Sequence, residues 1–481
     1  MAADRRNDVM MTRGDTWSPV IGSAVRASRT TESGVMSKQR GGIWSTAIRA
    51  AVIVFLLNFD QFPRTVGRAF LITGAVLAVL VVLHDLFRPA SRARVVVFWV
   101  LLMFGVLALP GILRRPETEY GQQKFFLLLT LTLLATISVA IIRGRRDVEM
   151  FAAIFLGCGV VLALAALVGE PQGDRSGGFG SNPIWLARAI GGAMVALAWL
   201  YFRSRLSGWW AAGIGLLLIL GLFATGSRGP LVATAAAVLT LVLAGLRQKG
   251  RRRRREWVGV GLMSSVVAAV WALPSLLPPR MYALIVDPSE ELFDSARADM
   301  RQRTLSVIAE NPGGVGYGNW NSHTWMIEHT YPHNLWLELT AEGGWLVGGL
   351  FMLAVAVVAI GLWRSAGTDP VAGFVLATLT FNVLAVSTSG DINASRPLFC
   401  SLALGLLVLI GATRDEGAGR HRMLGDAYRH GPPSWQGVDG RWRAPDRHLA
   451  STRRGVPPVS GRREPSRPRV GHGRAGECAR R

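Results

Sequence analysis

Arginine side chains supply most of the chemistry that this sequence offers between its apolar segments. Arg228 lies in Thr225-Gly226-Ser227-Arg228-Gly229-Pro230, where glycines let the backbone approach a ligand closely and Pro230 suits the first turn of a helix. Arg297 and Arg301 are four residues apart, which places two like charges on one face of a helix. A guanidinium group binds phosphate through two parallel hydrogen bonds. These residues therefore predict a phosphorylated ligand.

Two more arginines flank a glycine-rich segment. Arg175 lies in Asp174-Arg175-Ser176-Gly177-Gly178-Phe179-Gly180-Ser181-Asn182-Pro183, and Arg188 follows one turn into the next apolar segment. An arginine at that depth faces a cavity or a partner, because contact with lipid is costly. Two structural alternatives stay open: an ion pair of Arg175 with Asp174 or Glu170, and a role for Arg228 as an anchor to lipid headgroups.

His333 is the candidate base of the site. It lies in Pro332-His333-Asn334-Leu335-Trp336-Leu337-Glu338, at the predicted start of an apolar helix. Imidazole accepts a proton near neutral pH, and a helix N-terminus favours its neutral form. Glu338 and Glu342, one and two turns further on, are expected to orient His333 or to pair with an arginine. A purely structural histidine at the helix start is the alternative.

Composition identifies the setting as a membrane. The 481 residues are 50% hydrophobic and 17% charged, whereas soluble domains carry about a quarter charged residues. The net charge of +22 does not indicate a nucleic-acid partner, because the positive charge lies in the tails and in short loops. No metal-ligand cluster, P-loop or DxD-type carboxylate pair is present, so we expect no metal and no cofactor.

Apolar runs predict an all-α polytopic membrane protein with about twelve transmembrane helices. Several runs reach the roughly 20 residues that cross a bilayer core. The predicted spans are 43–57, 67–87, 95–113, 125–142, 149–169, 184–202, 208–224, 229–246, 256–273, 335–363, 371–388 and 397–412. Residues 1–42 and the basic tail 413–481 lack apolar periodicity and are predicted to be disordered.

Basic residues in the loops predict the orientation. Cytoplasmic loops carry an excess of Lys and Arg. With the N-terminus inside, the inner loops contain Arg88, Arg92, Arg94, Arg143, Arg145, Arg146, Arg203, Arg205, the run 247–255 and Arg364. Both termini are then cytoplasmic, and the candidate arginines and His333 face the outer side of the cell membrane. The basic tail is expected to contact anionic membrane lipids.

The segment 274–332 is the one long outer loop of this topology. Asp287-Pro288-Ser289-Glu290 has the pattern of a helix start, with a capping residue and proline at the first helical position. Apolar residues then recur at three- and four-residue spacing up to Ile308, and Asn311-Pro312 ends the pattern. We predict an amphipathic outer helix of about five turns.

The order of these motifs resembles the O-antigen ligase and polymerase superfamily of membrane glycosyltransferases. The matching stretches are Gly226-Ser227-Arg228-Gly229; Arg297, followed by Gly314-Val315-Gly316-Tyr317-Gly318-Asn319-Trp320; and His333-Asn334-x-x-Leu337-x-x-x-x-Glu342-x-Gly344. The loop around Arg175 is similar to the family's Arg-Gly-Asn-Pro loop. The resemblance covers about residues 170–412, within a transferase domain of residues 43–412. Met300-Arg301 departs from the family pattern of an apolar or aromatic pair.

The resemblance implies a metal-independent transferase with a GT-C-like fold. Such enzymes move a glycan from an undecaprenyl-pyrophosphate carrier to a hydroxyl acceptor, which is a lipid, a glycan or a protein. It further implies that His333 is the general base. Arg228 and Arg297 would hold the pyrophosphate and stabilise its charge. The resemblance supports a pyrophosphate-binding role less directly for Arg175. Arg301 and Arg188 are included as candidate pyrophosphate-binding residues on physical grounds and not through the resemblance.

Several functions share this pattern of residues. A chain polymerase and a protein O-glycosyltransferase of the same superfamily are not separated from a ligase by one sequence. A cell-wall polymerase would place an essential carboxylate in the long loop, which here is dominated by Arg and His. A transporter would place ionisable residues at mid-membrane and would use broken helices. The middle regions of the predicted spans are nearly free of charge and the polar residues collect on one side, which favours chemistry at the membrane surface.

Overall fold

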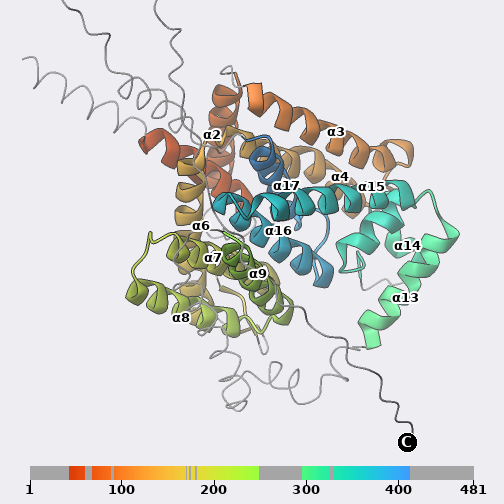
Figure 1. Ribbon diagram of the computed structural model, residues 1–481. Helices are drawn as coiled ribbons and strands as arrows, with labels where there is room; N and C mark the ends of the chain where they lie inside the picture. Colours follow the sequence, from red (N-terminus) through yellow and green to blue (C-terminus); the bar gives the residue numbers. More distant parts are fainter. Residues whose placement is uncertain are drawn as a thin grey trace, which may run out of the picture. The chain divides into compact units, whose positions relative to one another are not determined.

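The computed structural model describes residues 43–59, 68–87, 91–169, 171–172, 175–178, 181–248, 295–324 and 329–411. These residues are helical apart from loops and one short ladder, in which β1 (Pro171–Gln172) pairs antiparallel with β2 (Arg175–Ser176). The predicted all-α class is therefore confirmed for this part of the chain (Figure 1). The predicted terminal segments 1–42 and 413–481 and the predicted span 256–273 lie outside the described residues.

The helices follow the apolar runs of the sequence. After the helix Ile43–Leu57, the elements are α2 (Arg68–Leu86), α3 (Ser91–Leu113), α4 (Glu119–Leu127), η3 (Leu128–Thr132), α5 (Leu133–Ser138), η4 (Val139–Ile141), α6 (Arg145–Val168), α7 (Pro183–Phe202), α8 (Gly208–Ala224), α9 (Arg228–Leu246), α13 (Ser295–Glu310), α14 (Trp320–Thr324), α15 (Leu335–Ser365), α16 (Pro370–Thr388) and α17 (Arg396–Leu409).

Seven of the described helices are long and apolar enough to cross a membrane. They are Arg92–Leu113, Glu119–Ile141, Arg145–Val168, Pro183–Phe202, Arg228–Leu246, Leu335–Ser365 and Pro370–Thr388. Shorter apolar helices occupy four other predicted spans: Ile43–Leu57, Leu71–Leu86, Gly208–Ala224 and Arg396–Leu409. The chain is thus a helical protein with several membrane-spanning candidates, and the number twelve stays a prediction.

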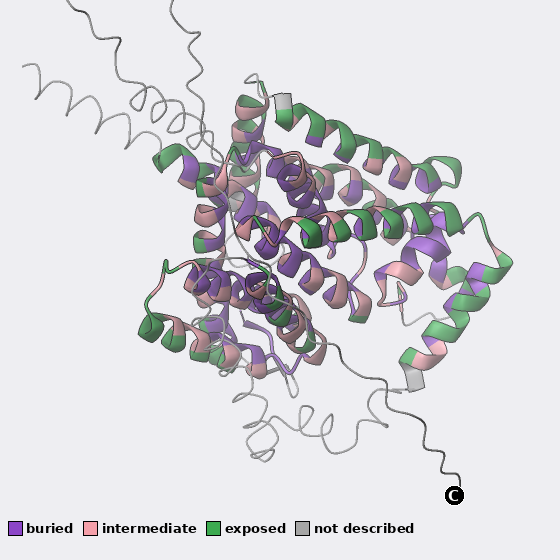
Figure 2. Ribbon diagram, in the orientation of Figure 1, coloured by how far each residue is buried: buried purple, intermediate pink, exposed green. Residues whose placement is uncertain are grey.

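Large apolar side chains cover the outward faces of many helices. Phe98 is 61% exposed, Leu216 59% and Leu346 70%. Figure 2 shows this exposure along α3, α8 and α15. Contiguous exposed apolar surface of this kind is unusual on soluble proteins and is expected where helices contact lipid.

Small residues let the central helices approach closely. Gly229 at the start of α9 lies against Thr388 at the end of α16, and Gly191 of α7 lies against Thr234 of α9 and Phe381 of α16. At each glycine a Cβ atom would overlap the neighbouring side chain. Interfaces between membrane helices favour small residues for this reason. The helices α7, α9 and α16 therefore pack with little space between them.

The helix α15 is broken at Gly344, where φ is 80° and ψ is 172°. The break frees two backbone carbonyls, which the loop after α13 then satisfies. Val315 N donates to Ala341 O and Gly316 N donates to Glu342 O, both at 2.9 Å. Trp345 N donates back to Pro312 O at 3.0 Å. The glycine-rich loop 313–318 is thus bonded to the break in α15.

The helix predicted within the segment 274–332 is present as α13, and its location on the outer side of a membrane stays a prediction. It ends at Glu310, directly before Asn311-Pro312 as expected, while its predicted start at Asp287 lies outside the described residues. Its apolar face is buried: Met300 is 2% exposed and Val307 4% exposed. With Ile308 they form a cluster with Val315, Trp320 and Ala341. The amphipathic pattern therefore attaches α13 to α15.

Candidate functional site

His333 lies just before the N-terminus of α15, as the sequence predicts. Asn334 caps the helix, since its Oδ1 accepts hydrogen bonds from Trp336 N at 3.0 Å and Leu337 N at 3.2 Å. His333 itself has φ of 52°, a left-handed conformation that is uncommon for residues other than glycine. Such conformations are held by the surrounding structure and are frequent at functional sites.

The surroundings of His333 keep its imidazole neutral. The Tyr331 ring lies 4.3 Å away between centroids, and the His329 ring lies 5.9 Å away. Partial burial lowers the pKa of His333 to about 4, with further lowering by the positive charge of Arg297 and by His329; Asp391 acts in the opposite direction. The imidazole is therefore an available proton acceptor at neutral pH, and its basicity is weakened by the nearby positive charge.

Arg297 and Arg301 lie on the exposed side of α13. Arg297 is close enough to His333 to affect its pKa. Arg303, two residues beyond Arg301, forms an ion pair with Asp299, with 2.9 Å between Nε and Oδ2. The structure thus places the charge of Arg297 within electrostatic range of His333, and it places Arg301 one turn further along the same helix.

The last turn of α16 brings Arg228 to the same end of the molecule as His333. Asn334 Nδ2 donates to Ser387 O at 3.0 Å, and Trp336 Nε1 donates to Ser387 Oγ at 2.7 Å. On the other side, Gly229 lies against Thr388. The residues that follow His333 and Arg228 therefore contact adjacent residues of α16.

Arg228 is the first residue of α9 and is partly buried. Gly226 has φ of 61°, so the predicted tight reversal before Arg228 depends on glycine at that position. Ser227 Oγ donates to Pro183 O at 3.4 Å, which connects this reversal to the start of α7. The glycines of the motif thus serve the turn and the helix packing.

Arg188 is bound by the protein itself. Its guanidinium group donates to Ala385 O at 2.6 Å, to Ala394 O at 3.3 Å and to Ser389 O. These carbonyls belong to the end of α16 and the loop that follows it. The sequence predicts that Arg188 faces a cavity or a partner. Its partners in the structure are backbone carbonyls near the C-terminus of α16, where carbonyl groups lack acceptor bonds within the helix. Arg188 is therefore a capping residue in this structure.

Arg175 lies in β2, in the loop that joins α6 to α7. The side chain of Ser176 fixes this loop, since its Oγ donates to Ala166 O at 2.5 Å. Asp174, Glu170 and the side chain of Arg175 lie outside the described residues. Connectivity places the loop at the end of the bundle where α7 starts.

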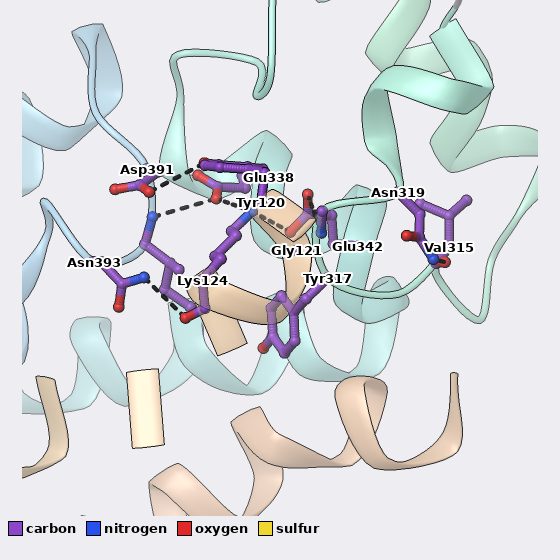
Figure 3. Close-up of polar contacts among 12 residues, drawn as sticks. Tyr120, Gly121, Lys124, Val315, Tyr317, Asn319, Glu338, Glu342, Asp391 and Asn393 are labelled. Carbon is purple, nitrogen blue, oxygen red and sulfur yellow. Dashed lines mark hydrogen bonds and ion pairs between the residues drawn. The ribbon is translucent and has the colours of Figure 1, made fainter. Parts of the chain in front are cut away.

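Glu338 and Glu342 pair with Lys124, a residue that the motifs of the sequence do not single out. Lys124 Nζ lies 2.5 Å from Glu338 Oε1 and also contacts Glu342 Oε2, and the side chains of all three are 0% exposed (Figure 3). Glu342 Oε1 accepts a hydrogen bond from Gly318 N at 3.1 Å. The prediction that these glutamates pair with an arginine is therefore wrong, because their partner is Lys124; the alternative that they orient His333 stays a prediction.

Asp391 extends this cluster toward His333. Its Oδ2 accepts a hydrogen bond from the Tyr120 hydroxyl at 3.1 Å and its Oδ1 accepts from Ala394 N at 2.8 Å. Tyr120 stacks on Tyr331, with 6.5 Å between centroids, and Tyr331 contacts His333. Figure 3 shows Asp391, from the loop after α16, beside Tyr120 and Lys124 of α4. Asp391 is thus the carboxylate that acts electrostatically on His333.

Known proteins are similar to the part of this chain that contains Arg228, Arg297 and His333. The family model described as O-antigen ligase matches residues 213–352, which include Arg228, Arg297 and His333. The O-antigen ligase of Pseudomonas aeruginosa is 29% identical over 253 residues, which are 50% of this chain and 58% of the relative. These matches support the resemblance of the chain to the O-antigen ligase and polymerase superfamily.

Some parts of the site lie outside the match to the O-antigen ligase family model. Lys124, Arg175, Arg188 and Asp391 all lie beyond residues 213–352. A solved structure described as a peptidoglycan synthase complex that coordinates polymerization and crosslinking is also similar, at 18% identity and a TM-score of 0.37. The similarity covers 66% of this chain and 98% of that chain.

The sequence contained a weak signal for the missed residues. Lys124 lies within an otherwise uncharged apolar stretch, Gln123-Lys124-Phe125-Phe126-Leu127, where a charge is costly unless it is paired. Asp391 lies in the short loop Ser389-Gly390-Asp391, and nothing in its local pattern identifies its partners. Lys124 directly precedes the predicted span 125–142, and Glu338 and Glu342 lie in the first two turns of the span 335–363, so the ion pair joins the ends of two predicted spans. Among the described residues no three His, Cys, Asp or Glu side chains group as metal ligands.

Proposed function

We propose that this protein transfers a glycan from an undecaprenyl-pyrophosphate carrier to a hydroxyl group of an acceptor. The observation that carries the proposal is the proximity of neutral His333 to the positive charge of Arg297, at the end of the molecule where α9 presents Arg228. A base beside groups that bind phosphate is what this reaction needs. The similarity of residues 213–352 to the O-antigen ligase family model supports the same class of chemistry.

In the proposed reaction His333 accepts the proton of the acceptor hydroxyl. The acceptor oxygen attacks the anomeric carbon of the donor glycan, a new glycosidic bond forms, and the bond between that carbon and the pyrophosphate oxygen breaks. The electron pair of the broken bond remains on the pyrophosphate. Neutral imidazole is the form that can take up the proton, and the pKa of about 4 keeps His333 in this form at neutral pH.

Arg228 and Arg297 are proposed to stabilise the departing pyrophosphate. Charge develops on the leaving group as the bond breaks, and guanidinium groups already in place stabilise this charge more than they stabilise the ground state. Arg175 and Arg301 are proposed as additional pyrophosphate contacts. Arg188 has a different part: its bonds to the end of α16 hold the segment that connects Arg228 to His333.

Binding of the pyrophosphate-linked donor would raise the pKa of His333 and so make it a stronger base. Arg297 lowers the pKa of His333 in the free protein. Pyrophosphate bound at Arg297 would offset this positive charge, so the pKa of His333 would rise when the donor is present. His333 would then be a stronger base in the complex than in the free protein.

The proposed location follows from the loop arginines. The site would face the outer side of the cytoplasmic membrane, with both termini in the cytoplasm, as the excess of basic residues at the opposite helix ends indicates. Cysteine labelling from either side of intact membranes tests this location: a cysteine at position 228 or 333 that is labelled from the cytoplasmic side would contradict it.

The decisive experiment supplies purified protein in lipid with a polyprenyl-pyrophosphate glycan and a lipid, glycan or protein acceptor. One glycan attached per acceptor is the expected product of a ligase. A ladder of lengths would instead identify a chain polymerase, and a glycosylated polypeptide would identify a protein O-glycosyltransferase. Movement of the intact donor across the bilayer without product would refute transfer and favour a transporter, for which the break in α15 and the buried Lys124 are the relevant features.

A further inference from the structure

His333 accepts the proton in the proposed reaction, yet no hydrogen bond orients its ring. Among the residues that the structure describes, none forms a hydrogen bond with either imidazole nitrogen of His333. The left-handed backbone at His333, with φ of 52°, fixes where the side chain begins but not how its ring turns. A catalytic base is normally oriented by a partner group. The contacts of the ring itself therefore decide how His333 meets an acceptor.

Tyr331 supplies the closest of the described ring contacts of His333. The two ring centroids lie 4.3 Å apart with 54° between the ring planes, which is a tilted aromatic contact. The His329 ring lies further away, at 5.9 Å, and meets His333 edge-on. Burial and the charge of Asp391 raise the pKa of Tyr331 to about 12, so its hydroxyl keeps its proton at neutral pH. Tyr331 is therefore a neutral ring against the base and not a second base.

A second tyrosine, Tyr120 in the first turn of α4, supports Tyr331. The two tyrosine rings are stacked, with 6.5 Å between centroids and 18° between planes. The Tyr120 hydroxyl donates to Asp391 Oδ2 at 3.1 Å, and Lys124 Nζ lies 5.6 Å from the centre of the Tyr120 ring. An ammonium group at this distance is attracted by the face of an aromatic ring. Two separate contacts therefore fix the Tyr120 ring, and this ring in turn limits the movement of Tyr331.

The support of Tyr120 belongs to the most enclosed part of the site. Lys124, one turn after Tyr120, pairs with Glu338 and Glu342, and all three side chains are fully buried. A catalytic group is held precisely when the side chains behind it are fixed by packing and by polar contacts. The contacts from this buried ion cluster to His333 run through two aromatic rings.

We propose that Tyr331 is a positioning residue for His333 and that Tyr120 holds Tyr331 in place. Tyr331 limits the imidazole to the orientation in which one nitrogen is directed at the acceptor hydroxyl, and it keeps water from the side of the imidazole that it covers. This inference rests on the proposed function for its effect on glycan transfer, whereas its effect on the imidazole itself does not depend on that function.

Removal of the Tyr331 ring has a defined effect on the imidazole. Burial is the largest cause of the low pKa of His333, so water admitted beside the ring raises this pKa. The charges that face His333 from other segments stay in place: Arg297 on α13 and His329 lower its pKa, and Asp391 raises it. The pKa of His333 should therefore rise from about 4 without reaching its ordinary value of 6.5.

The first test measures the imidazole directly, in the full chain reconstituted in lipid. Diethyl pyrocarbonate acylates neutral imidazole, and mass spectrometry of the peptides gives the rate at His333 as a function of pH. Tyr331→Leu should move the midpoint upward by about one pH unit or more, while Tyr331→Phe keeps the ring and should leave the midpoint unchanged. His323, exposed on α14, is the internal control and should titrate alike in all variants. An unchanged midpoint in folded Tyr331→Leu would overturn the proposal.

The second test measures glycan transfer at neutral pH. Tyr331→Leu should lower kcat about tenfold to a hundredfold, the usual loss when a catalytic group is misplaced, and Tyr331→Phe should retain activity. A base of higher pKa reacts at least as fast when its position is unchanged, so a lower rate together with a higher pKa identifies lost positioning. Phe98→Leu removes a ring from the exposed face of α3 and should transfer normally. A normal rate in folded Tyr331→Leu would refute the positioning role.

Tyr120→Phe examines the support of Tyr331. This variant keeps the stacked ring and removes only the hydrogen bond to Asp391, so kcat should fall several-fold. If Tyr331→Leu does not fold, an unchanged kcat in Tyr120→Phe overturns the proposal. Absence of transfer in the unaltered chain would refute the proposed function instead, and the midpoints measured with diethyl pyrocarbonate would then decide whether Tyr331 covers His333.

Discussion

Lys124 Nζ and Glu338 Oε1 lie 2.5 Å apart, with both side chains fully enclosed in the protein. Lys124 belongs to α4 and Glu338 follows His333 in the first turn of α15, so one ion pair joins two helices that are distant in the sequence. Ile392 N donates to Glu338 Oε1 at 3.3 Å, and Asn393 Nδ2 donates to Lys124 O at 2.9 Å. The loop that contains Asp391 is therefore attached to the same pair.

The first prediction concerns this cluster. Lys124→Met leaves two buried carboxylates without a cation, and we expect it to lower the free energy of unfolding by about 3–5 kcal/mol. The triple variant Lys124→Met, Glu338→Gln, Glu342→Gln removes all three charges and should recover much of this loss, since the amide oxygen introduced by Glu342→Gln can still accept from Gly318 N. Thermal unfolding in detergent measures both. A triple variant as unstable as the single one would show that the charges are not the cause.

The second prediction tests His333 as the base. His333→Ala should lower the rate of transfer by about 10²–10⁴-fold, the usual contribution of a general base, while the folded protein is retained. His323→Ala is the matched control, because His323 is exposed on α14 and has no part in the proposed chemistry. Transfer at a near-normal rate in His333→Ala would remove this residue as the base.

The third prediction concerns pH. The reaction needs neutral His333. As pH falls, kcat/KM should therefore stay high and decline only near pH 4, which is about the pKa of His333 in the free protein. The acidic limb of kcat should lie at higher pH, because bound pyrophosphate offsets Arg297 and raises the pKa in the complex. Arg297→Gln removes one cause of the low pKa and should move the limb of kcat/KM upward. An unperturbed limb near 6.5 in both parameters would contradict this assignment.

The fourth prediction separates a phosphate ligand from a membrane anchor at Arg228. Arg228→Lys keeps the charge and loses the planar pair of donors. Activity should fall about tenfold to a hundredfold, the equivalent of one charge-assisted hydrogen bond of about 1.5–3 kcal/mol. Arg364→Lys, at an exposed position near the end of α15, is the control. Full activity in Arg228→Lys would mean that the side chain serves only as an anchor.

The fifth prediction concerns the break in α15. A Cβ atom at Gly344 would lie 2.7 Å from Gly313 C and 2.8 Å from Pro312 O, in a backbone conformation with φ of 80° that side chains rarely adopt. Gly344→Ala should therefore lower the free energy of unfolding by at least about 1–3 kcal/mol. Gly349→Ala, in the same helix with nothing within 4 Å of the added atom, should be neutral or slightly stabilising. Equal Tm values for the two variants would contradict this account.

The local pattern of the sequence determined the elements and their ends. Apolar runs predict the helices because a lipid-facing or buried helix must be apolar along its length. Asn334, Pro183 and Asn311-Pro312 identify helix boundaries because capping and the missing amide of proline act within one turn. The same local motifs identified His333, Arg228 and Arg297 as residues of interest.

Tertiary structure alone decided which charged groups meet. Lys124 and Asp391 have no distinctive sequence neighbourhood, and their partners come from helices far along the chain. The position of Arg188 in the sequence predicts contact with a ligand. In the structure, the end of α16 and the loop after it instead supply three carbonyl acceptors for its guanidinium group. The reason is physical: a buried charge is satisfied by whichever acceptor packing brings within about 3 Å, and packing depends on contacts that no single segment encodes.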